Sequence, residues 1–232
     1  MKGKTVVVTG GFGALGRGVA EAASQRGALV AALDVAARPP AGLAERLGPE
    51  ALLLGGVDLS TAEGAAKAIA EVRAKFGRLD ALINIAGGFR WETVEAGDAA
   101  TWEFLFALNL KTALNASKAA IPHLIESGAG RIVNIGAGSA VKAAAGMGPY
   151  AASKAAVHKL TESLAEELKN RGVTVNAVLP SIIDTPANRT DMPKANFDHW
   201  VKPADLAAVI LFLASDEAKA VTGALIPVTG GV

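Results

Sequence analysis

TVVVTGGFGALGR, residues Thr5 to Arg17, joins a short β-branched run to a glycine-rich turn and then to an alanine-rich stretch with helical periodicity. The first part predicts a buried strand and the last part a helix. Glycines between them let the backbone bend sharply and approach a ligand, while the free amides at a helix start attract phosphate. We therefore predict a dinucleotide-binding turn, whose contacts come from Gly10, Phe12, Gly13, Leu15 and Gly16.

A carboxylate stands where the second predicted strand ends. Asp34 follows that strand at about the 20-residue offset expected of a side chain that binds the adenosine ribose. Its charge would accept hydrogen bonds from the ribose hydroxyls and repel a 2′-phosphate. We expect NAD(H) as the preferred cofactor and NADP(H) as the less favoured one. Arg17 and Arg38, which lie nearby in the sequence, could soften that preference.

The alternation of strand and helix continues along the whole chain, which predicts βαβ units. We predict an α/β fold: a single-domain, Rossmann-like, doubly wound parallel sheet of about seven strands with helices on both faces, spanning residues 1–232. The predicted strands are Thr5–Thr9, Leu29–Leu33, Leu52–Val57, Ala81–Ile85, Arg131–Ile135, Thr174–Leu179 and Ala224–Val228. The predicted helices are Leu15–Arg26, Thr61–Lys75, Ala99–Glu126, Tyr150–Arg171 and Pro203–Ala214.

Two stretches follow neither period, residues 87–100 and 181–202. Long irregular segments in a compact domain are often functional. Both follow predicted strands, and ligands bind beyond the carboxyl ends of the strands in such sheets. We expect these two segments to form the loops that hold a substrate.

The chain contains one tyrosine, Tyr150, and Lys154 follows it by four residues at the head of a predicted helix. Residues four apart share a helix face, so the lysine ammonium can stand beside the phenol. Bringing a phenol from its ordinary pKa of about 10 to about 7 takes about 4 kcal/mol. One cation at about 4 Å supplies that much at an effective dielectric of about 20, although burial opposes it. The pair therefore predicts an acid/base catalyst, helped by the charge of an oxidised nicotinamide.

Composition excludes several other classes. With 23 basic and 22 acidic residues and a net charge of +1, the chain shows no footprint for nucleic acid. It has no cysteine, and its three histidines show no ligand spacing, so we predict no metal site. The apolar stretch near the N-terminus is too short for a signal peptide or a membrane span, so we expect no membrane contact and a cytoplasmic location.

Together these motifs resemble the short-chain dehydrogenase/reductase family over nearly the whole chain. The turn from Thr9 to Gly16 and the Tyr150/Lys154 pair are similar to its cofactor turn and catalytic pair. The resemblance implies catalytic roles for Tyr150 and Lys154, both also touching cofactor, and for Asn109, which would hold a proton-relay water. It also implies cofactor contacts from Asp58, Leu59, Ala86, Gly87, Pro180, Ile183 and Thr185.

One departure from the family pattern bears on activity. Ala137 stands thirteen residues before Tyr150, where relatives carry a catalytic serine. An oxyanion donor is worth about 2.7–4 kcal/mol, so a simple ketone reductase without it should be slow. Three explanations stay open. Ser139 supplies the hydroxyl, the substrate needs less stabilisation, or the protein is a dinucleotide-binding regulator or scaffold whose catalysis has lapsed.

Within the family, several stretches resemble the quinonoid dihydropteridine reductase group, above all Leu179 to Trp200. That resemblance implies hydride transfer from NADH to a carbonyl or a quinonoid, imine-type small molecule, with an extra oxyanion donor not required. The runner-up is a 3-oxoacyl or ketone/alcohol reductase that uses Ser139. Candidate substrate contacts, each of which could equally be loop packing or a solvated side chain, are Phe89, Trp91, Met147, Asn188 and Arg189. The two aromatic side chains could stack on a flat ring.

The helical stretches 99–126 and 150–171 carry more alanine and leucine than one sheet face needs. The resemblance to the family implies that these helices pair across a two-fold axis, and a self-complementary patch would do so by isologous contact. We therefore expect a homodimer or homotetramer.

Overall fold

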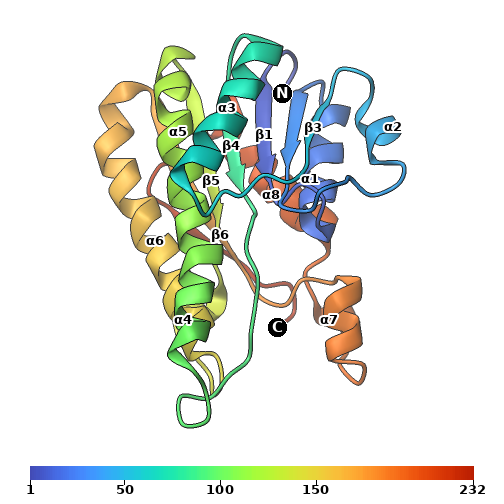
Figure 1. Ribbon diagram of the computed structural model, residues 1–232, viewed down its shortest axis with the longest axis vertical. Helices are drawn as coiled ribbons and strands as arrows, with labels where there is room; N and C mark the ends of the chain where they lie inside the picture. The colour runs from blue at the N-terminus through green and yellow to red at the C-terminus, as the bar shows by residue number, and fades with distance from the viewer.

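The computed structural model describes residues 1–232 and contains one seven-stranded sheet, parallel throughout (Figure 1). Its order is β3-β2-β1-β4-β5-β6-β7, so the winding direction reverses between β1 and β4. The strands are β1 Thr5–Thr9, β2 Leu29–Leu33, β3 Leu52–Leu54, β4 Ala81–Asn84, β5 Gly130–Ile135, β6 Val173–Pro180 and β7 Leu225–Val228. The predicted fold class is confirmed.

Helices cover both faces of the sheet (Figure 1). On one face α1 and α8 pack against each other and against side chains such as Val6 and Val30. On the other, α3, α5 and α6 cover Val7 and Ile132. The helices are α1 Ala14–Gln25, α2 Leu43–Leu47, α3 Ala62–Phe76, α4 Ala99–Leu105, α5 Thr112–Glu126, α6 Gly148–Leu168, α7 Pro186–Asp191 and α8 Pro203–Leu213.

The structure departs from the predicted elements most clearly at three places. The strand predicted to reach Val57 ends at Leu54, because Gly56 takes a positive φ of 72° and Gly55 passes so close to Ala37 that a Cβ would lie 2.4 Å from its carbonyl oxygen. The five-residue α2 was not predicted, since it is too short to show a period. The long helix predicted over 99–126 is interrupted by a π-helical segment, Phe106–Lys111.

The two irregular segments also differ from the prediction in part. Residues 87–98 form an extended connection from β4 to α4, as expected. Residues 181–202 contain α7 and a short 3-10 turn, Phe197–His199. Helix α7 starts at Thr185, whose hydroxyl accepts the amide of Asn188, and the Pro186 that follows has a φ already suited to the first turn. No helix in the structure combines the length and the apolar character needed to cross a bilayer.

Candidate active site

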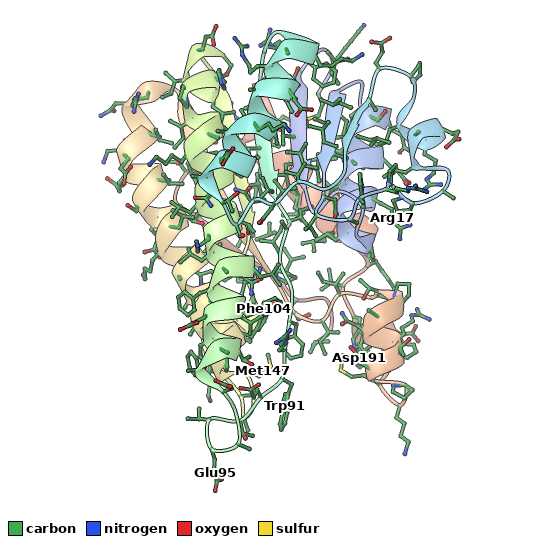
Figure 2. All side chains as sticks on the ribbon, in the orientation of Figure 1. Arg17, Trp91, Glu95, Phe104, Met147 and Asp191 are labelled. Atoms are coloured by element: carbon green, nitrogen blue, oxygen red, sulfur yellow. The ribbon has the colours of Figure 1, made fainter.

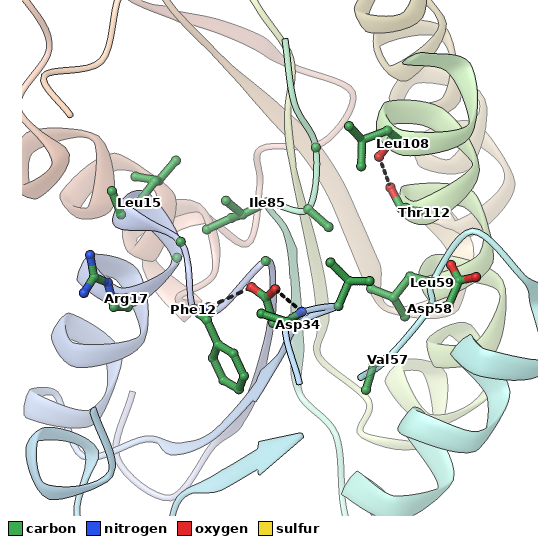
Figure 3. Close-up of a pocket in the computed structure, with 18 of the residues that line it drawn as sticks. Phe12, Leu15, Arg17, Asp34, Val57, Asp58, Leu59, Ile85, Leu108 and Thr112 are labelled. Carbon is green, nitrogen blue, oxygen red and sulfur yellow. Dashed lines mark hydrogen bonds between the residues drawn. The ribbon is translucent and has the colours of Figure 1, made fainter. Parts of the chain in front are cut away.

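A cleft of about 970 Å³ opens at the carboxyl ends of β1, β2 and β4 (Figure 3). This is the switch point of the sheet, where ligands bind in such folds. The predicted cofactor residues that line it are Gly10, Phe12, Gly13, Leu15, Gly16, Asp34, Asp58, Leu59, Ala86, Gly87 and Thr185. The remaining predicted ones, Tyr150, Lys154, Pro180 and Ile183, do not line this cavity.

The glycine turn is packed backbone against backbone. A Cβ on Gly16 would lie 2.1 Å from the carbonyl oxygen of Gly10, and one on Gly10 would lie 2.9 Å from the amide nitrogen of Ala86. Gly10 also has a φ of +63°, which disfavours other residues. At Gly13 the nearest atom would be at 3.4 Å, an ordinary contact. At Gly10 and Gly16 any side chain would therefore collide with backbone atoms. The absence of side chains there leaves room for a dinucleotide at the start of α1.

Asp34 is held at the base of the cleft by two amides. Its carboxylate accepts hydrogen bonds from the backbone N–H of Phe12 at 2.9 Å and of Ala36 at 3.0 Å (Figure 3). Arg17 and Arg38 line the same cavity, and the buried Nε of Arg17 has no partner. The cleft therefore contains a carboxylate held by two backbone amides and, on other parts of its lining, two cationic side chains.

Asp58 both lines the cleft and holds a turn. Its carboxylate accepts hydrogen bonds from the amide and the hydroxyl of Ser60. These two bonds lower the pKa of Asp58 below its ordinary value. These contacts are those of a turn cap, and the cofactor role that the resemblance implies for Asp58 stays a prediction.

Two of the predicted catalytic side chains, those of Lys154 and Asn109, lie close to Gly87 beside the cleft. The Nζ of Lys154 donates to the carbonyl oxygen of Ile135 at 2.8 Å. Asn109 lies in the π-helical segment, with Oδ1 accepting the amide of Gly88 at 2.9 Å. A Cβ on Gly87 would lie 2.6 Å from that Oδ1 and 3.4 Å from the lysine nitrogen. Gly87 therefore connects the cofactor cleft to the lysine and the asparagine.

The pKa values differ from the expectation. Burial raises the pKa of Tyr150 to about 12 and lowers the pKa of Lys154 to about 8. The phenol is therefore not made acidic in this structure, because burial disfavours its charged form. At neutral pH the phenol keeps its proton, which is the state a general acid needs.

Ala137, which stands at the position of the family's serine, leads into a short turn. Ala137 is buried, extended, and directly precedes a 3-10 turn, Gly138–Ala140, that packs against α6. Ser139 lies in this turn and is half-exposed. Ser139 therefore lies on a turn that contacts the helix carrying Tyr150.

Segment 87–98, which belongs to the first of the two predicted substrate loops, runs from β4 to α4 (Figure 2), and we call it the first wall. The ring of Phe89 meets that of Tyr150 edge to face, with centroids 5.0 Å apart. The guanidinium of Arg90 lies 4.0 Å from the centroid of the Phe104 ring. Trp91 donates from Nε1 to the carbonyl oxygen of Ala145 at 3.1 Å. The sequence left open whether Phe89 and Trp91 pack within the loop, and in the structure both do. The contact of Arg90 with Phe104 was not predicted, because it joins two segments that are distant in the sequence.

The second wall is held together by ion pairs. Arg189 bonds Asp184 through Nε and a terminal nitrogen, at 2.5 and 2.9 Å, and Lys202 bonds the same carboxylate at 2.8 Å. The Arg189 side chain is half-exposed to solvent and its charge is paired with this carboxylate, and its contact with a substrate stays a prediction. Asn188 is also engaged, donating to the carbonyl oxygen of Ile183 at 2.8 Å. Met147 lies on the opposite wall, half-buried near Trp91 (Figure 2).

Comparison with known proteins gives a consistent result. The short chain dehydrogenase family matches residues 4–196. Nodulation protein G of Azospirillum brasilense is 35% identical over 244 residues, covering 100% of this chain and 99% of that protein. The 3-oxoacyl-[acyl-carrier-protein] reductase FabG of Thermotoga maritima is 32% identical over 247 residues, and the match covers 100% of this chain and 98% of that protein.

A solved structure agrees in fold and in coverage. The 3-ketoacyl-(acyl-carrier-protein) reductase of Brucella melitensis, complexed with NADH, superposes with a TM-score of 0.89 at 27% identity, covering 99% of this chain and 98% of that one. These relatives are not dihydropteridine reductases, so they do not support the narrower of the two predicted resemblances. They support the broader one, and the chain belongs to the short-chain dehydrogenase/reductase family.

Proposed function

We propose that this protein is an NADH-dependent reductase of a small-molecule carbonyl, of the ketone or 3-oxoacyl type. The observation that carries the proposal is the meeting of Lys154, Asn109 and Gly87 between the cofactor cleft and Tyr150. A hydride donor placed in the cleft and a proton donor on α6 would then reach one carbonyl group from two sides. Holding the reactants in this way contributes through proximity.

The residues of the cleft fit a dinucleotide. The space kept free by Gly10 and Gly16 would take the pyrophosphate, and Asp34 would bind the adenosine ribose. When bound, NADH supplies the hydride. Asp34 supports NADH over NADPH, and the Brucella relative is described with NADH. Arg17 and Arg38 line the same cavity, and their positive charges would favour the 2′-phosphate of NADPH. The preference for NADH over NADPH is therefore tested below.

The residues of this chain supply the rest of the chemistry. Tyr150 donates a proton to the carbonyl oxygen as hydride arrives at the carbon. The Lys154 ammonium stabilises the phenolate that remains. Asn109 holds the backbone of Gly88 in place and lies where a proton-relay water would reach the lysine. Ser139 is the candidate for the second hydrogen-bond donor to the oxyanion, in place of the serine absent at Ala137.

A second candidate substrate is a quinonoid or imine-type ring compound, such as a quinonoid dihydropterin. Two observations favour it. Ala137 removes a donor that a readily reduced substrate would not need, and the side chains of Phe89 and Trp91 are 52% and 62% exposed on the substrate wall. Exposed aromatic rings of this kind can stack on a flat ligand.

A direct assay separates these substrates. We would follow NADH oxidation with a 3-oxoacyl thioester, a panel of simple ketones and a quinonoid dihydropterin, and compare wild type with Ser139→Ala. For a ketone or oxoacyl substrate we expect Ser139→Ala to lower kcat about 100-fold, the size of one oxyanion donor. The same variant should leave quinonoid turnover nearly unchanged.

Ala137→Ser is the matched change, since it restores the hydroxyl at the family position. It should partly rescue ketone turnover in the Ser139→Ala background. Tight NADH binding without turnover of any substrate would contradict the proposal and favour a dinucleotide-binding regulator. The Kd values of NADH and NADPH can be compared by titrating the protein with each cofactor. Tighter binding of NADPH than of NADH would contradict the argument from Asp34.

A further inference from the structure

A buried histidine lies behind the active-site turn, and the mechanism above gives it no role. His158 follows Tyr150 by two helical turns and Lys154 by one, so the three share a face of α6. Its side chain is 5% exposed. Its Nε2 accepts a hydrogen bond from the backbone N–H of Ala137 at 3.3 Å.

Lys154 holds the same piece of backbone one helical turn earlier. Its Nζ donates to the carbonyl oxygen of Ile135, two residues before the amide that His158 binds. The residue between them is held by the sheet, because the N–H of Gly136 donates to the carbonyl oxygen of Val178 at 2.9 Å. The chain leaving β5 is thus fixed by two side chains of α6 and one bond from β6.

Gly136 and His158 also fit each other in shape. A Cβ on Gly136 would lie 2.4 Å from Nε2 and 2.7 Å from Cδ2 of the imidazole. Such distances are far inside van der Waals contact, so the ring fills the space that a side chain at position 136 would need. This contact sets where the chain runs as it enters Ala137 and Ser139.

The hydrogen bond also sets the state of the ring. Because Nε2 accepts the Ala137 amide, the neutral imidazole carries its proton on Nδ1. Burial, followed by the charge of Lys154, lowers the pKa of His158. Glu162 opposes this shift, while Lys159 adds to it. The ring is therefore neutral at physiological pH and remains an acceptor.

We propose that His158 is a positioning residue, which holds residues 136–139 against α6 so that the substrate carbonyl meets both Tyr150 and the hydroxyl of Ser139. The inference rests on the proposed function, since the turn matters only where a carbonyl is reduced. His158 touches neither substrate nor cofactor in this arrangement. It acts through the amide of Ala137.

Two variants test the role of the acceptor. His158→Gln and His158→Met introduce unbranched side chains of similar length, and only glutamine offers an acceptor near the place of Nε2. We expect the methionine variant to lose about tenfold in kcat, the size of one lost hydrogen bond, and the glutamine variant to stay within about threefold of wild type. KM for NADH should stay unchanged in both, and a thermal unfolding curve reports whether each is folded.

The outcomes separate the two proposals. A wild-type protein that turns over no substrate overturns the proposed function and this inference together. Turnover by wild type with equal kcat in the two variants overturns the role of His158 alone. A rise in KM for NADH that matches the loss in kcat also overturns it, because general damage to the fold would act on both sides of the cleft.

A second pair of variants covers the case in which His158→Met does not fold. Gly136→Ala places a methyl group against the imidazole and should lower kcat about tenfold. His158→Ala alone should also lower kcat about tenfold, because it removes the acceptor, and the double variant should lose about tenfold rather than a hundredfold, because both changes break the same contact. A loss of about a hundredfold in the double variant would show that the two residues act independently and would refute the fit between them.

Discussion

The two sides of the cleft are built from different parts of the chain. On the predicted cofactor side the glycine turn packs backbone against backbone, and a Cβ on Gly16 would lie 2.1 Å from the carbonyl oxygen of Gly10. On the predicted substrate side the side chains make the surface, with Phe89 against Tyr150 and Trp91 over Gly146. A backbone surface tolerates few substitutions, whereas a surface of side chains can change residue by residue. Cofactor binding and substrate choice can therefore be altered separately.

The largest expected effect is on kcat, and it separates the chemical step from the binding of cofactor and of substrate. Tyr150→Phe keeps the ring that packs against Phe89 and removes only the hydroxyl. Loss of a general acid typically costs about 10²–10⁴-fold, so we expect kcat to fall by that much. The Kd for NADH, measured by fluorescence titration, should stay within about twofold, because Tyr150 does not line the cofactor cavity.

A matched control for this experiment is Phe89→Leu, which removes the packing partner and leaves the hydroxyl. It should change KM for the substrate more than kcat. If Tyr150→Phe turned over the best substrate as fast as wild type, the proton would have to come from another group, and the role given to Lys154 would fail with it.

The cofactor side is tested by two glycines of the same motif. Gly16→Ala drives a methyl group into the backbone of Gly10, while Gly13→Ala meets nothing closer than 3.4 Å. Overpacking against backbone costs up to about 3 kcal/mol, so we expect the Kd for NADH to rise about 100-fold for Gly16→Ala. Gly13→Ala should stay within about threefold of wild type, which a pair of titrations on folded protein would show. Equal losses would mean that the motif is sensitive to any side chain, whatever its space.

The cofactor side was also the part that the sequence predicts best. The glycine spacing and the position of Asp34 follow from local rules, and the structure places both in the cavity. The strand boundaries of β1 and β2 were predicted to the residue, since both are short buried runs ended by glycine or aspartate. Local geometry is enough for such features because each depends on neighbours along the chain.

The substrate side could be predicted only as two irregular segments. The ion pairs of Asp184 with Arg189 and Lys202 join residues up to eighteen positions apart, and no period or spacing announces them. His158 was seen in the sequence and set aside for lack of ligand spacing. The spacing of two helical turns between His158 and Tyr150 could have shown that both side chains lie on one face of the helix. It could not show that His158 binds the amide of Ala137, because that residue follows β5, far away in the sequence. Contacts between distant segments require the fold to be known.

The next prediction concerns the pH dependence of kcat, which we expect to follow the charge of Lys154. Burial lowers the pKa of Lys154 to about 8, so its ammonium is present below that pH and is lost above it. Because this charge stabilises the phenolate left after proton donation, kcat for reduction should be flat below about pH 8 and fall about tenfold per unit above it. A pH profile with saturating NADH measures this. Lys154→Met should lower kcat and abolish the decline, whereas a wild-type profile that stays flat well above pH 8 would contradict the assignment.

The smallest effect tests whether the substrate wall is independent of the cofactor side. Gly146 has a φ of +74°, and a Cβ there would lie 2.0 Å from the Trp91 ring, whereas Gly128 has the same φ and nothing within 4 Å. Both alanine variants pay the cost of about 1–2 kcal/mol for a left-handed residue, which thermal unfolding should show in each. Only Gly146→Ala must also displace Trp91, and we expect it to raise KM for the substrate about fivefold, a loss of about 1 kcal/mol. The Kd for NADH should not change in either variant. If Gly128→Ala raised the substrate KM as much, the effect would come from backbone strain, and Trp91 would have no part in substrate binding.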